Sequence, residues 1–231
     1  MTGGASLDRQ QIAANLALGI ETLGLSLSAT QQEQLLSYMD LIQKWNKVYN
    51  LTALRDPQEM LTHHLLDSLS AIGPLMRHLQ NHPTLNQASC SLLDVGSGGG
   101  LPGVVIAICC PKVAVTCVDA VSKKAAFVQQ VAASLKLPNL KGVHARVETL
   151  TGPFDVICSR AFASLPDFVT WSGEALAEAG VWMAMKGKMP TEELASLPTF
   201  ASVFHVEQLQ VPGLDAERCM IWMKKTATSQ S

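Results

Sequence analysis

The sequence predicts an α/β protein with a seven-stranded, mostly parallel sheet, a C-terminal antiparallel hairpin and an N-terminal helical extension. Two patterns indicate this fold class. Apolar residues recur at helical spacing through the first 85 or so positions. From position 91 onward, short apolar runs alternate with helical patterns, which is typical of a doubly wound sheet. We therefore expect a helical extension over residues 1–85 and a sheet-containing core over residues 86–231.

The extension is predicted to contain three helices. Apolar residues repeat at helical spacing in the first of them, over residues 12–23. The second helix opens at Ser28 or Thr30, either of which can cap its amino end. The third opens at Asp56, because a proline follows at the first helical position. We expect this third helix to run to about residue 72, where a Gly-Pro pair follows.

Seven apolar runs in the second part are predicted to be strands, with helices between most of them. The predicted strands cover residues 92–95, 113–118, 142–147, 154–158, 181–185, 203–211 and 219–223. The predicted helices cover residues 103–110, 123–137, 165–179 and 191–196. Because little chain separates the last two strands, they are expected to form an antiparallel hairpin.

Composition excludes several classes of protein. Of the 231 residues, 48% are hydrophobic and 16% are charged, yet no stretch approaches the roughly 20 apolar residues of a membrane span. The first six residues lack the basic and apolar segments of a secretory signal, so a cytoplasmic location is expected. The formal net charge is -2, so a nucleic-acid partner would have to be bound through a local basic face.

The six cysteines are predicted to be buried thiols, because they lack any C-x-x-C spacing and five lie in or beside apolar runs. Cys158, within the fourth strand, is therefore expected to be a core thiol rather than a nucleophile. His63-His64 is interpreted as a helix-surface pair, and no metal site is expected, since no second cluster has ligand spacing. Trp45 and Tyr49 could stack on bases, but aromatic residues at helical spacing more often belong to a core.

A glycine-rich segment, LLDVGSGGGLPG at residues 92–103, joins the first predicted strand to the next helix. Glycines such as Gly96, Gly98 and Gly100 let the backbone approach a ligand, and a helix N-terminus adds unpaired N–H groups. The glycines alone would also suit a dinucleotide. Asp94 favours S-adenosylmethionine, because an acid there would repel a pyrophosphate but hold a methionine ammonium. Asp119, at the end of the second strand, is placed to accept the ribose hydroxyls of either cofactor.

Two further candidate positions follow the third and fourth strands. Val147-Glu148 lies where such folds contact adenine, although a solvated acid at a helix start explains Glu148 nearly as well. Arg160 ends the fourth strand, where it is expected either to reach the active-site mouth or to form a surface ion pair. The segment after this strand lacks the Pro-Pro-aromatic motif of amino-group methyltransferases. Methylation at N7 of guanine would need no general base, because that nitrogen already carries an exposed lone pair.

Several motifs, in order along the chain, resemble those of the glucose-inhibited division protein B family. They are WNKVYNLT at 45–52, HLLDS at 64–68, the glycine segment with LPG at 101–103, SRAFAS at 159–164 and AMKG at 184–187. The resemblance spans roughly residues 25–224. Members of that family are Rossmann-like bacterial methyltransferases of a guanine N7 in the 530 loop of 16S ribosomal RNA.

The resemblance implies S-adenosylmethionine-dependent methylation of N7 of guanine 527, on 16S rRNA or on a small-subunit assembly particle, by a protein expected to be a monomer. A small-molecule or other RNA methyltransferase with the same core is the alternative. The run of three glycines at 98–100 departs from many members but keeps their N–H donors. Positions that match the family's cofactor contacts are Gly96, Leu101, Asp119, Val147, Glu148 and Arg160. Arg146, Arg160 and Lys186 match basic residues that flank its active site, and Arg55 and His64 fall in its N-terminal motifs.

Overall fold

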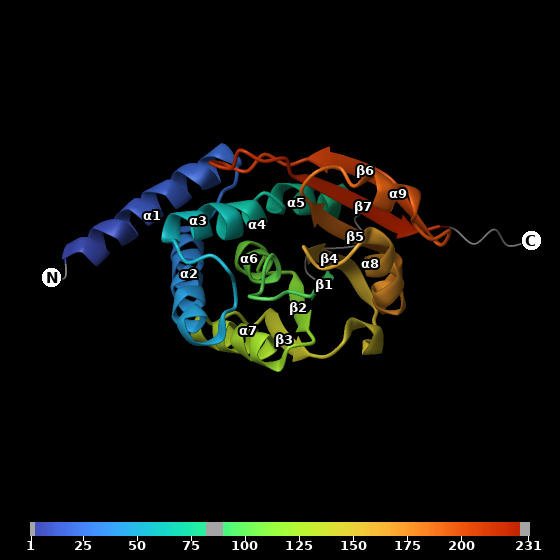
Figure 1. Cartoon of the computed structure of the whole chain (residues 1–231), viewed down its shortest axis with the longest axis horizontal. Coiled ribbons are helices and arrows are strands. Elements are labelled where there is room, and N and C mark those ends of the chain that lie inside the picture. Colours follow the sequence, from blue (N-terminus) through green and yellow to red (C-terminus); the bar gives the residue numbers. More distant parts are fainter. Residues whose placement is uncertain (1–2, 82–89, 227–231) are drawn as a thin grey trace, which may run out of the picture.

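The structure, a computed structural model, describes residues 3–81 and 90–226, and within these residues its centre is a seven-stranded sheet (Figure 1). The strand order is β3-β2-β1-β4-β5-β7-β6. The first five strands are parallel, and β7 runs antiparallel to β5 and β6. The predicted sheet with its antiparallel terminal hairpin is therefore confirmed. The strands are β1 (Ser91–Val95), β2 (Ala114–Asp119), β3 (Leu140–His144), β4 (Phe154–Arg160), β5 (Leu176–Lys186), β6 (Ala201–Gln208) and β7 (Cys219–Lys225).

Helices cover both faces of this sheet, as the alternation of apolar side chains along its strands requires. In β1, Leu92 packs with the helices of one face and Leu93 with those of the other. The helices α6 and α7 belong to the first face, whereas α8 and α9 belong to the second. Their bounds are α6 (Gly103–Cys109), α7 (Ser122–Ser134), α8 (Leu165–Ser172) and α9 (Thr191–Ala195). Because the first five strands run parallel, their carboxyl ends lie along one edge of the sheet, which is where ligands of such folds bind.

The N-terminal helices form a further layer against α6 and α7 (Figure 1). They are α1 (Gly3–Thr22), α2 (Ala29–Tyr49), α3 (Pro57–Met60), the π-helical turn η1 (Leu61–Leu66), α4 (Asp67–Leu69) and α5 (Ile72–Asn81). Two glutamines of α2 bind the layer beneath: Gln31 donates to the carbonyl of Ile108, and Gln34 to that of Leu135. One hydrophobic cluster therefore runs from this layer into the sheet.

The structure refines the predicted helix boundaries of this layer. Ser28, rather than Thr30, caps α2, because it forms a capping box with Gln31. Asp56 caps α3 as predicted. The third helix does not run unbroken to residue 72, because a π-helical turn interrupts it. Pro74 lies near the start of a further helix, α5, where the first amides have no partner within the helix, so the N–H that proline lacks costs no hydrogen bond.

Several strand boundaries also differ from the prediction, among them the end of β6, which is Gln208 rather than residue 211. The strand β3 ends at His144, not at residue 147, because its partner β2 ends at Asp119, opposite His144. The strand β5 begins at Leu176, in a stretch predicted to be helical, because it pairs there with Phe154 of β4. The pairing with a neighbouring strand thus outweighs the helical composition of residues 176–179.

The boundary predicted between residues 85 and 86 lies outside the described residues, so the division into two parts stays a prediction. No helix in the described residues is long and apolar enough to cross a membrane.

Candidate functional site

The loop after β1 has the backbone shape that its glycines permit. Gly96, Gly98 and Gly100 have φ angles of 64°, 58° and 89°, a region that favours glycine. At Gly96 a close approach adds to this requirement, since a Cβ atom would lie 2.1 Å from the Phe162 ring. The Gly96 amide also donates to the carbonyl of Val118 in β2, at 2.9 Å. The loop is therefore fixed at the carboxyl ends of β1 and β2.

Asp119 ends β2, and its buried carboxylate joins this loop to the start of α7. Its Oδ2 accepts from the Gly98 amide at 3.0 Å, and its Oδ1 accepts from the Val121 amide at 2.8 Å. The Lys124 ammonium lies 3.8 Å from Oδ2. The carboxylate thus stands beside the glycine loop, the position expected of a group that binds ribose hydroxyls.

Asp94 lies on the face of β1 that packs against α6, where it is fully buried. Its Oδ2 accepts from the Gly103 amide at the start of α6, at 2.8 Å. Burial raises the pKa of Asp94 to about 7, against the lowering effects of the Gly103 amide and of Arg160. Asp94 lines neither of the two cavities described below, so its direct contact with a methionine ammonium stays a prediction.

The helical layer holds the glycine loop through Tyr38 of α2. The Tyr38 side chain is fully buried, and its hydroxyl donates to the carbonyl of Gly99 at 2.5 Å. Burial raises the pKa of Tyr38, so the hydroxyl keeps its proton as a donor. Its ring stacks on Phe127 of α7, with centroids 6.4 Å apart. The loop is therefore supported by both β2 and the N-terminal layer.

A cavity of about 570 Å³ opens between the glycine loop, the N-terminal layer and the ends of β4 and β5. This volume suits a cofactor-sized ligand, because small-molecule sites span roughly 300–1,000 Å³. Of the residues predicted from the sequence, Gly96, Gly98, Leu101, His64, Arg160 and Lys186 line this larger cavity. The other lining residues are Ile42, Leu51, Thr52, His63, Asp67, Ser97, Gly99, Lys124, Ala161, Met185, Gly187 and Arg218.

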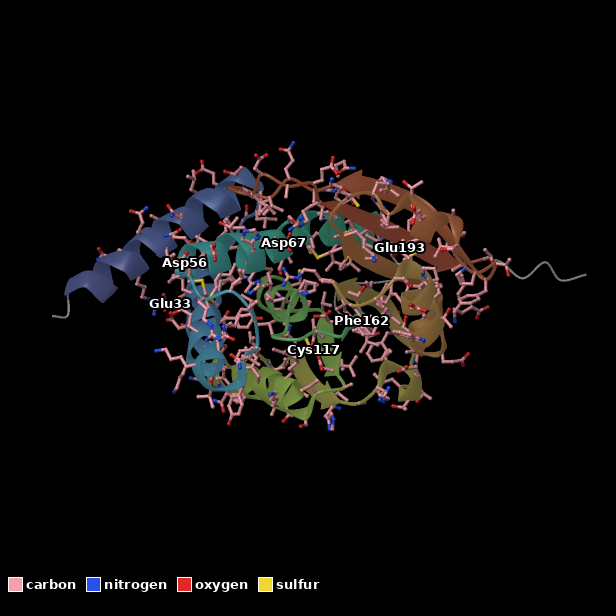
Figure 2. The ribbon with its side chains drawn as sticks, viewed as in Figure 1. Glu33, Asp56, Asp67, Cys117, Phe162 and Glu193 are labelled. Carbon is pink, nitrogen blue, oxygen red and sulfur yellow. The ribbon has the colours of Figure 1, made fainter. Side chains whose placement is uncertain are left out.

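Arg160 ends β4 and binds the helical layer. Its Nη1 donates to Asp67 Oδ2 at 2.7 Å and to the carbonyl of His63 at 2.8 Å. Asp67 lies on α4 (Figure 2) and is only 3% exposed, and its Oδ1 accepts from Nε of Arg218 at 2.8 Å. Arg160 therefore lines the cavity, and its ion pair with Asp67 is part-buried rather than at the surface, while its role at the active site stays a prediction.

Lys186 ends β5 and holds the loop that follows β4. Its ammonium donates to the carbonyl of Ala163 at 2.9 Å and to Glu193 of α9 at 2.8 Å. Glu193 also accepts from the Leu165 amide at the start of α8. Lys186 thus lines the larger cavity while its charge is paired with Glu193.

A smaller cavity of about 230 Å³ lies beyond Gly96, which lines both cavities. Phe162 (Figure 2) and Trp171 form part of its wall and meet edge to face, with centroids 5.9 Å apart. A wall of this kind suits a flat aromatic ring. The predicted residues on this cavity are Gly96, Asp119, Arg146, Val147 and Glu148. The structure thus separates Arg146 from Arg160 and Lys186, which line the other cavity.

The interpretation of His63-His64 as a surface pair is wrong for one of the two residues. His63 is exposed, but His64 is buried and its Nε2 lies 2.7 Å from the Thr52 hydroxyl. Burial, with a smaller effect of Arg160, lowers the pKa of His64 to about 4. His64 lies in the π-helical turn and is buried there together with three leucines. His64 is therefore a neutral imidazole in the cavity wall at neutral pH.

The remaining predicted residues lie as follows. Arg55 is exposed, and its guanidinium donates to the Asn46 carbonyl and the Asn50 side chain across the end of α2. Trp45 packs edge-on against a buried phenylalanine of α7, as a core residue does. The same interpretation is wrong for Tyr49, which is 41% exposed.

Cys158 is a buried thiol, as predicted. It is fully buried, and desolvation raises its pKa well above the ordinary value, so it is not a thiolate nucleophile. Of the six cysteines, all lie in described residues and none forms a disulfide. In the described part of the chain, no group of three His, Cys, Asp or Glu side chains is placed to hold a metal ion.

Among the residues of the site that the sequence analysis missed, three make its supporting contacts: Tyr38, Asp67 and Arg218. A signal existed for Asp67, because an acid within an otherwise apolar helical run is rarely buried unless it is paired. Arg218 stands alone before the last strand and Tyr38 is one apolar position of α2, so nothing in their local sequence singles them out.

Comparison with known proteins identifies relatives along nearly the whole chain. A protein from a Polaromonas species, named ribosomal RNA small subunit methyltransferase G, is 70% identical and covers 91% of this chain and 92% of its own length. A protein of the same name from Verminephrobacter eiseniae is 56% identical, covering 96% of this chain and 98% of its own.

Solved structures share the fold at low identity. Magnesium protoporphyrin IX methyltransferase from Synechocystis, with bound S-adenosylhomocysteine, has a TM-score of 0.56 at 11% identity, over 83% of this chain and 99% of its own. TrmN from Thermus thermophilus has a TM-score of 0.55 at 16% identity, over 72% of this chain and 53% of its own. Both likenesses confirm a Rossmann-like methyltransferase fold.

The family model described as rRNA small subunit methyltransferase G matches residues 31–221. This range includes the glycine loop, both cavities and the ion-pair cluster. The cofactor is S-adenosylmethionine, as predicted. The residues present fit it, because the glycine loop is open at Gly98 and Gly99, where an added Cβ would meet no atom closer than 4.0 Å, and two cavities adjoin at Gly96. The chain therefore belongs to the rRNA small subunit methyltransferase G family.

Proposed function

We propose that this protein transfers the methyl group of S-adenosylmethionine to N7 of guanine 527 in the 530 loop of 16S rRNA. The names of the relatives support a small-subunit ribosomal RNA substrate, and the ordered sequence motifs support this nucleotide. The proton-accepting side chains of the larger cavity support ring nitrogen 7 as the methyl acceptor.

Three candidate general bases line the larger cavity, namely Asp67, His64 and the exposed His63, and the two buried ones are poorly suited to that role. Among its described lining residues, Asp67 is the one acid, and both of its oxygens are bound by arginines. His64 has a pKa of about 4, far below the value near the working pH that general-base catalysis requires. An acceptor that must lose a proton, such as an amine or a hydroxyl, would therefore depend on His63. Guanine N7 has no proton to lose, and its in-plane lone pair can attack directly.

The residues of the chain would then act by position and charge. When bound, S-adenosylmethionine supplies an electrophilic methyl group on a sulfonium centre. We assign the adenosine to the smaller cavity, where Asp119 would accept from the ribose and Val147 and Glu148 would contact adenine. The methionine would follow the glycine loop past Gly96 into the larger cavity, near Arg160. Holding acceptor and methyl group in line without water is the main source of rate in such a site.

Arg160 is the residue assigned to join the cofactor and the acceptor. In the described part of the chain its Nη1 donates to protein acceptors, whereas Nη2 and Nε make no hydrogen bond. These two nitrogens could donate to the guanine O6 or to the methionine carboxylate, and so orient one against the other. We assign Arg146 and Lys186 as further basic residues that flank the site. Lys186 would act through the loop after β4, whose Ala163 carbonyl it binds.

We further propose that the protein acts in the cytoplasm as a monomer, on 16S rRNA or on a small-subunit assembly particle. Cleavage mapping of N7-methylguanosine in 16S rRNA, from cells with and without the gene, tests the nucleotide. Loss of the modification at guanine 527 alone is the expected result. Methylation of another nucleotide, or turnover of a small molecule in place of RNA, would contradict the proposal.

The role of Arg160 is tested by Arg160→Lys and Arg160→Ala in single-turnover methylation of 16S rRNA. Both should slow methyl transfer by on the order of 10- to 100-fold, about 1.4 to 2.7 kcal/mol. Alanine removes the side chain's charge and donors, whereas lysine keeps the charge but loses the planar set of N–H donors. Arg77→Lys, which alters an ion pair with Glu207 away from the cavity, is the matched control and should keep the wild-type rate. Wild-type rates in Arg160→Ala would remove Arg160 from the site.

A further inference from the structure

We propose that Asp67 is a positioning residue, which orients the Arg160 guanidinium for methyl transfer together with the π-helical turn before it. The inference rests on the proposed function, because it concerns the rate of that reaction. Asp67 lines the larger cavity, but both of its carboxylate oxygens are bound by arginines, so it would act through Arg160.

The carboxylate of Asp67 is fixed from two sides. Its two oxygens accept from different arginines, Arg160 at 2.7 Å and Arg218 at 2.8 Å, which come from the end of β4 and from the segment before β7. Asp67 is 3% exposed, and a buried carboxylate is retained only where such partners compensate its lost hydration. The side chain therefore has one well-defined position, from which it can define the position of Arg160.

The π-helical turn supplies the second acceptor for Arg160. In an α-helix the Asp67 amide would bind the carbonyl of His63, four residues earlier. Here that amide bonds to the carbonyls of Thr62 and His64 instead, and the His63 carbonyl accepts from Arg160 Nη1 at 2.8 Å. Turns of this type occur frequently at functional sites. The widened turn thus places a main-chain acceptor and the Asp67 carboxylate around one nitrogen of Arg160.

Two acceptors on Nη1 fix the plane of the guanidinium, and they leave Nη2 and Nε for a ligand. Arg160 also lines the larger cavity, beside the glycine loop. A misplacement of about 1 Å can slow an enzyme by about 100-fold, so the support of this side chain bears on rate and not on stability alone. The N-terminal layer would in this way contribute to catalysis, although the cofactor loop belongs to the sheet.

A different function for the cluster would be to join the helical layer to the sheet, with no effect on the reaction beyond stability. A double-mutant cycle separates the two. If Asp67 acts through Arg160, replacing Asp67 should matter only while Arg160 is present. If the cluster is only a structural link, Asp67→Asn should lower the thermal melt but leave kcat of the folded enzyme unchanged in both backgrounds.

The cycle uses the full chain with Asp67→Asn, Arg160→Ala and both changes together. We would measure kcat and KM for 16S rRNA at saturating S-adenosylmethionine, the cofactor affinity by calorimetry, and the thermal melt. The expected result is a fall in kcat of about 10- to 100-fold in Asp67→Asn, and a change of less than about 2-fold when the same substitution is made in Arg160→Ala. Equal losses in both backgrounds, or wild-type kcat in Asp67→Asn, would overturn the proposal.

A second variant protects the test against misfolding, since breaking a buried ion pair is strongly destabilising. Arg218→Gln removes only the second partner of Asp67, and it should lower kcat by about 3- to 10-fold, again only while Arg160 is present. A loss that persists in Arg160→Ala would assign Arg218 a direct role and count against the proposal. Arg77→Gln, in an exposed ion pair with Glu207, is the control and should change nothing.

The wild-type arm distinguishes failure of this inference from failure of the proposed function. If the wild type methylates a nucleotide other than guanine 527, the proposed function is wrong, but the double-mutant cycle can still be measured with that nucleotide as the methyl acceptor. If guanine 527 is methylated and the two backgrounds respond equally, the positioning role alone is wrong.

Discussion

Replacing Asp94 by asparagine should remove a loss of stability that the wild type suffers as pH rises. The carboxylate is fully buried beneath α6, and burial raises its pKa from the ordinary 3.8 to about 7. The substitution keeps an oxygen that can accept from the Gly103 amide, which Asp94 Oδ2 now does at 2.8 Å. The change therefore removes the ionisable group with little change of shape.

The sign and size of the effect follow from these two pKa values. The folded protein binds the proton more tightly than the unfolded chain, so the free energy of unfolding falls as pH rises between 3.8 and about 7, and the loss is complete above pH 7. At about 1.36 kcal/mol per unit, the whole effect is about 4 kcal/mol. Between pH 5 and pH 8, Asp94→Asn should therefore become more stable relative to the wild type by about 3 kcal/mol.

Urea unfolding followed by circular dichroism, at pH 5, 6, 7 and 8, measures this difference. Asp215→Asn, which removes an exposed acid before β7, controls for the loss of one negative charge. Parallel stability profiles for Asp94→Asn and the wild type would refute the assignment of the raised pKa to Asp94. Calorimetry extends the test to the cofactor: if Asp94 acts on the methionine ammonium, S-adenosylmethionine should bind more tightly as pH rises through 7 in the wild type alone.

Three further outcomes are expected. Gly98→Val should abolish S-adenosylmethionine binding in a folded chain, because a φ of 58° is strained for a β-branched residue; calorimetry beside a thermal melt checks this, and unchanged affinity would show that the loop is only a turn. Tyr38→Phe should lower the free energy of unfolding by about 1 kcal/mol and weaken cofactor binding, since it removes the bond to Gly99; an unchanged melt and affinity would contradict this. His64→Gln should make the protein less sensitive to acid, because the folded-state pKa of about 4, below the ordinary 6.5, makes the wild type lose about 3 kcal/mol of stability as pH falls from 6.5 to 4. Urea unfolding at pH 5 and 7 measures this difference, and identical stability profiles would refute it.

The sheet could be predicted from the sequence because its signals are local. Strands buried on both faces read as short apolar runs, and the segment at 92–103 marks the turn into α6 by its glycines. The start of β5 could not be predicted, because Leu176 lies in a stretch of helical composition and becomes a strand only through its pairing with Phe154.

The candidate site was predictable where one residue follows one strand. Asp119 and Arg160 end their strands at the ligand edge, as their positions in the sequence indicate. Asp67 and Arg218 are 151 residues apart, and their contact depends on tertiary packing that no local pattern encodes. Asp94 is fully buried because it lies on the face of β1 that packs against α6, and the glycine motif alone does not specify that face.

The two glutamine contacts of α2 have a consequence for synthesis of the chain on the ribosome. The carbonyl bound by Gln34 belongs to Leu135, 101 residues later, so α2 is translated well before its partner surface. At roughly 5–20 residues per second this interval lasts about 5 to 20 s. During this interval the apolar face of α2, which includes Tyr38, lacks its partner helix α7. The nascent protein therefore exposes an amphipathic helix that holding chaperones can bind until α7 has been made.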